Sequence, residues 1–208
     1  MKQYGAKEEK INVVSHAIGI VLASVGLILL LIKGFIHKNP TNIISYTIFA
    51  LSMILLYTAS TLYHNSKEEQ KRKHLKIFDH ASIYILIAGS YTPFALIGLQ
   101  GTIGWLIFGV AWGIALTGII LKLFFTGRFK IVSTIMYVLM GWIVIFAIGP
   151  LRERLSTEAL FWLFAGGASY TIGALLYSIK KIPYNHATFH ILVLGGTFCH
   201  FIAIYLYI

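Results

Sequence analysis

Two histidines that could bind one metal ion open the last apolar segment of the chain, in the sequence HATFH at residues 186–190. Residues four apart share one face of a helix, so His186 and His190 can reach the same ion. Three imidazoles are a common ligand set for catalytic zinc, which keeps a fourth position for water. A third histidine must then come from elsewhere in the chain, and His64 is the best candidate.

Two further polar residues fit the chemistry of such a site. Asp79 is the only aspartate of the chain. A carboxylate beside the water at a zinc site can orient that water or act as a general base. Ser60 lies one turn before His64 on the same helical face, so its hydroxyl can reach the same cavity. We therefore predict that zinc is bound by His64, His186 and His190, with Asp79 and Ser60 beside it.

The composition identifies the elements that must position these residues. Hydrophobic residues make up 58% of the 208 residues and charged residues 12%, and the mean hydropathy is +0.80. A soluble globular domain would have too little polar surface at this composition. The net charge of +10 could indicate nucleic acid. In a membrane protein such charges set topology and contact anionic lipid headgroups, so we expect no nucleic-acid partner.

Seven apolar segments are each near the length of about 20 residues that spans a bilayer. Because backbone groups must be paired inside lipid, and the segments are too long for barrel strands, we expect helices. The predicted fold is an all-α seven-transmembrane helix bundle, with a short segment at residues 1–10 and one membrane domain at residues 11–208. The predicted spans are residues 11–33, 42–64, 78–99, 102–122, 131–150, 157–179 and 186–208.

The basic residues predict the orientation of this bundle. Of the 17 lysines and arginines, 13 fall on the side of the N-terminus, before the first span or between later spans. The other four are Lys33, Lys38, Arg152 and Arg154. The positive-inside rule then places the N-terminus in the cytoplasm and the C-terminus outside. Arg128, in the segment after the fourth span, is among the 13.

With this orientation, the polar residues converge at one membrane depth. His16 lies in the first turns of the first span, and His64 ends the second. Asp79 lies at the start of the third span, and the HATFH pair begins the seventh. All of these positions fall near the cytoplasmic boundary. Ionisable residues inside membrane spans are costly and are therefore functional candidates.

The remaining histidines have simpler interpretations. His37 and His74 fall in loops, where we expect them to be solvated, as we do for Glu8, Glu9, Glu68 and Glu69. His80 points about 100° away from Asp79 on a helix, which favours packing or a hydrogen bond. His200 lies about 15 Å deeper than His190 and fits a buried hydrogen-bonded histidine or the polar lining of a cavity. His16 could join the site or bond to a neighbouring helix.

Three motifs in these segments resemble those of the bacterial hemolysin III family, within the progestin and adipoQ receptor (PAQR) family of seven-span membrane proteins. They are E-x-x-N-x-x-x-H at Glu9, Asn12 and His16, S-x-x-x-H at Ser60 and His64 followed by Asp79, and H-x-x-x-H at His186 and His190. The resemblance covers essentially the whole chain.

This resemblance implies a zinc ion held by His64, His186 and His190, with Asp79 and Ser60 near its water. The superfamily is similar to alkaline ceramidases, which implies hydrolysis of a lipid amide or ester and a role in membrane lipid homeostasis. The expected partner is therefore a membrane lipid, as substrate or ligand, and the expected location is the bacterial cell (inner) membrane. Two alternatives stay open, namely a receptor-like regulator with structural zinc and a pore-forming cytolysin.

Overall fold

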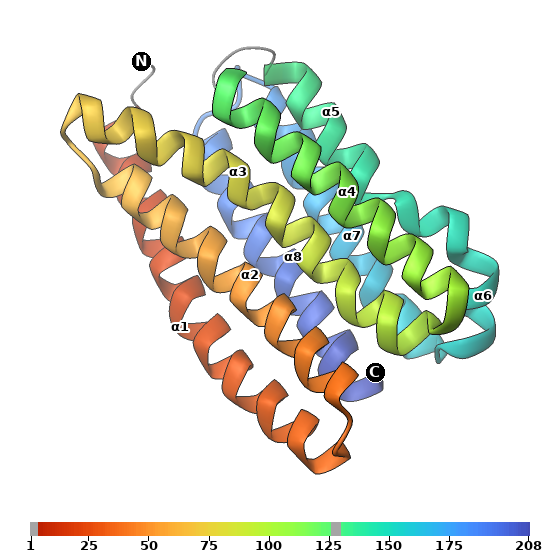
Figure 1. The fold of residues 1–208 in the computed structure, drawn as a ribbon. Helices are drawn as coiled ribbons and strands as arrows, with labels where there is room; N and C mark the ends of the chain where they lie inside the picture. Colours follow the sequence, from red (N-terminus) through yellow and green to blue (C-terminus); the bar gives the residue numbers. More distant parts are fainter. Residues whose placement is uncertain (1–3, 126–129) are drawn as a thin grey trace.

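The computed structural model describes residues 4–125 and 130–208, and every described element is helical (Figure 1). The elements are α1 (Ala6–His37), α2 (Pro40–Asn65), α3 (Glu69–Pro93), the π-helix η1 (Phe94–Leu99), α4 (Gly101–Phe125), α5 (Lys130–Gly141), the 3₁₀-helix η2 (Ile143–Ala147), α6 (Ile148–Arg154), α7 (Thr157–Ser178) and α8 (Asn185–Tyr207).

Seven helices in the described part of the chain are long and apolar enough to cross a membrane, which confirms the predicted all-α fold. The start of α1 and the C-terminus lie at opposite ends of the bundle (Figure 1). Each span packs against its neighbour in the sequence, and α1 also packs against α8, which brings the first and last spans together. The site residues of α1, α2, α3 and α8 therefore come from helices in direct contact.

The third span is longer than the hydropathy predicted. We expected it to begin near residue 78, but α3 begins at Glu69, so most of the predicted basic loop is helical. His74 is exposed there, as expected, and Lys73 pairs with Glu69 at 3.2 Å across one exposed turn. Arg72, by contrast, is only 4% exposed. Arg128 lies outside the described residues.

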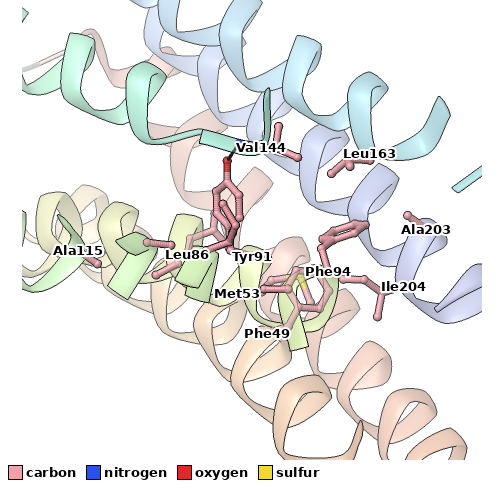
Figure 2. Close-up of a cluster of buried hydrophobic side chains, with 14 of the residues drawn as sticks. Phe49, Met53, Leu86, Tyr91, Phe94, Ala115, Val144, Leu163, Ala203 and Ile204 are labelled. Carbon is pink, nitrogen blue, oxygen red and sulfur yellow. Dashed lines mark hydrogen bonds between the residues drawn. The ribbon is translucent and has the colours of Figure 1, made fainter. Parts of the chain in front are cut away.

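The fifth span is broken where it meets α3. Helix α5 ends at Gly141, and a 3₁₀ segment connects it to α6. The Tyr91 hydroxyl donates to the Gly141 carbonyl at 2.7 Å and accepts from the Val144 amide at 3.0 Å (Figure 2). A neighbouring side chain thus satisfies backbone groups that a break inside the membrane would leave unpaired. The break places Tyr91 and Val144 in the buried core, close to Phe94 of η1.

We predict that the N-terminus lies in the cytoplasm and the C-terminus outside, because basic residues concentrate at the N-terminal side. Fluorescent-protein and alkaline-phosphatase fusions at each end would test this orientation. The fluorescent protein should fold at the N-terminus, and the phosphatase should be active only at the C-terminus. The reverse pattern would contradict the predicted orientation and move the site to the outer boundary.

Candidate metal centre

Three buried histidines meet where α2 ends and α8 begins. Their ligand atoms all lie within 4.8 Å of one another, and these are His64, His186 and His190. The Nε2 atom of His186 lies 3.0 Å from Nε2 of His64 and 3.1 Å from Nε2 of His190. The structure therefore brings together the three histidines that the sequence selected as ligands.

Residues of α1 orient two of the three imidazoles. The Nδ1 atom of His64 lies 2.6 Å from the carboxylate of Glu9, and Nδ1 of His190 lies 3.3 Å from the backbone carbonyl of Asn12. Because a carboxylate and a carbonyl only accept, each Nδ1 must carry the proton. Both Nε2 atoms are then lone-pair acceptors that face His186.

This arrangement fits a metal ion. A neutral His186 has one proton, so it cannot donate to both His64 and His190, and its Nδ1 has no hydrogen-bond partner among the described residues. Buried lone pairs that face one another at about 3 Å repel unless a cation or a proton lies between them. Imidazole groups whose other nitrogen donates to a carboxylate or carbonyl are typical metal ligands.

The Glu9 carboxylate is held in turn by a buried arginine. Arg72 donates to Glu9 and to the Ser66 carbonyl, and its guanidinium lies 4.9 Å from the centre of the Tyr63 ring. The side chains of Arg72 and Glu9 are only 5% and 16% exposed. Glu9 is thus a largely shielded link between a cation and His64, and our prediction that it is solvated was wrong.

Asp79 and Ser60 are both buried, and Asp79 lines the same cavity as His186. The Asp79 carboxylate is 10% exposed, interacts electrostatically with His64 and His186, and lies 3.3 Å from Nδ1 of His80. The same His80 nitrogen also donates to the Lys76 carbonyl at 2.8 Å. A hydrogen bond was one of the two roles that we expected for His80. The Ser60 hydroxyl is buried and has no hydrogen-bond partner among the described residues. Asp79 can therefore contact a molecule bound in the cavity, and Ser60 is one helical turn before His64 on α2.

His16 also lies at this site, but its side chain makes no hydrogen bond to another described residue. Its ring stacks on His190 with 3.8 Å between centroids, and the residue is 3% exposed. Neither ring nitrogen has a hydrogen-bond partner in the described part of the chain. A buried polar group without a partner costs about 1–3 kcal/mol, so His16 is a candidate for contact with a ligand.

The N-terminal residues cover the site at the end of the bundle. The Tyr4 ring stacks on His186 with 4.5 Å between centroids, and Glu8 accepts a hydrogen bond from the His186 amide at 3.3 Å. Burial, with a smaller contribution from Tyr177, raises the pKa of Tyr4 well above its ordinary value. The Tyr4 hydroxyl therefore stays protonated and adds no negative charge beside the three histidines.

A cavity of about 170 Å³ leads from this site into the bundle. Asp79, His16 and His186 line one part of it, and Phe94 and His200 line another. His186 and His200 are 14 residues apart on α8, which corresponds to roughly 21 Å along the helix axis. Most of the lining side chains are apolar. The candidate metal centre is thus connected to a long apolar chamber.

The supporting residues carried a signal in the sequence. Glu9, Asn12 and His16 recur at the spacing of one helical face, which indicates a common buried neighbour. Arg72 is the one arginine in a segment of lysines at residues 67–76. The planar guanidinium is better suited than an ammonium group to a buried carboxylate.

We predict that Glu9→Gln will weaken zinc binding by about 10–100-fold, because the partner that orients His64 loses its charge. The glutamine oxygen can still accept from Arg72, so the fold should persist. Competition with a chromogenic chelator would measure the affinity of the purified protein. Glu69→Gln removes an exposed carboxylate and should leave the affinity unchanged. Equal affinities in all three proteins would contradict the role of Glu9.

Comparison with known proteins identifies a matching family and several relatives of this chain. The family described as Haemolysin-III related matches residues 4–201. The chain is 42% identical to Hemolysin-3 of Bacillus cereus and 43% identical to a Hemolysin-3 homolog of Bacillus subtilis (strain 168), over 97% of this chain and 92% and 94% of those proteins. It is 27% identical to the human monocyte to macrophage differentiation factor, over 97% of this chain and 84% of that protein.

The relatives and the seven apolar helices together indicate a multi-pass protein, for which the bacterial inner membrane is the expected location. The family match extends from the residues that cover the site, near Tyr4, into the last span. The human relative supports the wider PAQR relationship expected from the motifs. The chain belongs to the haemolysin-III-related family of seven-span membrane proteins.

Proposed function

We propose that this protein is a zinc-dependent hydrolase that cleaves an amide or ester bond of a membrane lipid and so acts in membrane lipid homeostasis. The observation that carries the proposal is the connection between the three histidines and the apolar cavity. His186 is both a member of the triad and part of the cavity wall. A lipid chain in the cavity would hold its carbonyl group beside the imidazoles.

Zinc fits this donor set, because three imidazoles are a common protein ligand set for catalytic zinc. When bound, zinc supplies Lewis-acid chemistry, since it polarises a carbonyl group and makes water a stronger acid. His64, His186 and His190 would hold the ion. Glu9 and the Asn12 carbonyl would keep two of these rings in the orientation that ligation needs.

The other polar residues have separate roles in the proposed reaction. Asp79 accepts a proton from the attacking water, whose oxygen forms a bond to the carbonyl carbon. The C–N or C–O bond then breaks, and the proton passes from Asp79 to the leaving amine or alcohol. His16 and Ser60 have no partner among the described residues, so they are free to donate to the carbonyl oxygen as negative charge develops there.

A panel of lipids tests this function. Purified zinc-loaded protein in nanodiscs would be incubated with ceramides and glycerolipids, and the products read by mass spectrometry. We expect fatty acid release from at least one class, lost on chelation and restored by zinc. If the fully loaded protein releases none, the hydrolase proposal fails and a receptor with structural zinc becomes the better account. Leakage of a dye from vesicles without hydrolysis would instead favour a cytolysin.

A further inference from the structure

The deep part of the cavity contains a pair of polar rings in an apolar setting. His200 of α8 and Tyr170 of α7 both line the cavity, with ring centroids 5.3 Å apart. Their neighbours there include Phe94 and Leu163. Polar side chains at this depth are costly, so such a pair is a functional candidate.

Two glycines make room for these rings in a reciprocal way. A Cβ atom on Gly166 of α7 would overlap the His200 ring, and one on Gly196 of α8 would lie 2.6 Å from the Tyr170 ring. Each helix therefore lacks a side chain where the polar ring of the other helix lies. Helix packing alone would be satisfied by apolar rings in these spaces.

The hydrogen bonds of this pair are incomplete. His200 Nε2 lies 3.2 Å from the Leu163 carbonyl, so Nε2 must donate and Nδ1 is an acceptor. Nδ1 has no partner among the described residues, and neither does the Tyr170 hydroxyl. Ser90 of α3 lines the same cavity and interacts with Tyr170, while its own hydroxyl donates to the Leu86 carbonyl. The Tyr170 and Ser90 side chains therefore both face the cavity.

The acceptor of His200 and the hydroxyl of Tyr170 determine which ligand group could form hydrogen bonds with both. A ligand hydroxyl can donate to His200 Nδ1 and accept from the Tyr170 hydroxyl, whereas a methylene group can do neither. A ketone or ether oxygen could accept from Tyr170 but could not donate to His200. The geometry points to a binding subsite for a hydroxyl group on the hydrocarbon chain of a lipid, and we propose that the protein prefers lipids with a hydroxylated chain.

This inference deepens the proposed function by naming its substrate class, and it rests on the cavity binding a lipid chain. His200 lies ten residues beyond His190 on α8, which is about 15 Å along the axis. A hydroxyl at one particular distance from the reacting carbonyl should therefore reach the subsite. Positional isomers then test the inference, because a nonspecific gain from added polarity would not depend on position.

The experiment is equilibrium binding of stearic acid and of hydroxystearic acids that differ in hydroxyl position, to zinc-loaded protein in detergent. We expect one isomer to bind about 10-fold more tightly than stearic acid, which corresponds to about 1.4 kcal/mol. Tyr170→Phe removes only the hydroxyl and should abolish the preference without changing the affinity for stearic acid. Tyr137→Phe makes the same change at another cavity-lining tyrosine and should keep the preference.

Equal binding of all isomers and stearic acid by the wild type would overturn the subsite, as would a preference that survives in Tyr170→Phe. In that case, a water molecule would be the simplest hydrogen-bond partner for His200 and Tyr170. Failure of the hydrolase proposal would look different. Binding would still depend on hydroxyl position and on Tyr170, while the lipid panel released no fatty acid.

Discussion

Replacing His190 with Ala should reduce the zinc content of the purified protein from about one ion per chain to near zero, and His186→Ala should do the same. Both residues come from α8, and their Nε2 atoms lie 3.1 Å apart. Losing either leaves two imidazoles, which is too few for a tightly held ion. Elemental analysis of protein purified without added metal would measure the loss.

Exposed histidines provide the matched controls. His37 and His74 are both exposed, so their replacement by Ala should leave the zinc content unchanged. Thermal melting provides a second measurement, because a ligand present at 1,000 times its Kd stabilises the native state by about 4 kcal/mol. Added zinc should raise the Tm of wild type but not of His190→Ala. Normal zinc in both α8 variants would refute the ligand assignment.

The parts of the fold that the sequence predicted are those with a local physical cause. Seven apolar segments predict seven helices because every backbone group inside lipid must be paired within its own segment. The alternating direction of those spans predicted that His64 and the HATFH pair lie at the same membrane depth. Without the topology, only spacings within one helix were visible, such as that of His186 and His190.

The parts that the sequence did not predict depend on contacts between distant residues. Hydropathy cannot show that α3 continues beyond the membrane as far as Glu69, so the predicted spans leave Arg72 in a loop. The break in the fifth span depends on the hydroxyl of Tyr91, about 50 residues earlier. The contacts of Glu9 require α1 to pack against α2 and α3, and the stacking of His16 on His190 requires α1 to pack against α8.

Asp79→Asn should keep the zinc content of wild type but lower the rate of lipid hydrolysis by about 10²–10⁴-fold. Asparagine keeps the size of the side chain and an oxygen toward His80, but it cannot accept the proton of the attacking water. Asp79 is not among the three residues whose ligand atoms meet, so the metal site should stay complete. The rate would be measured on the lipid that the wild type cleaves fastest.

A comparison with Glu9→Gln separates a proton acceptor from a residue that supports the metal site. Glu9 contacts His64, so its variant should regain activity when zinc is in excess. Asp79→Asn should stay inactive at every zinc concentration, because what it lacks is a base and not the ion. If excess zinc restores Asp79→Asn, or if its zinc content falls with its activity, Asp79 supports metal binding instead. Wild-type turnover in Asp79→Asn would remove it from the reaction.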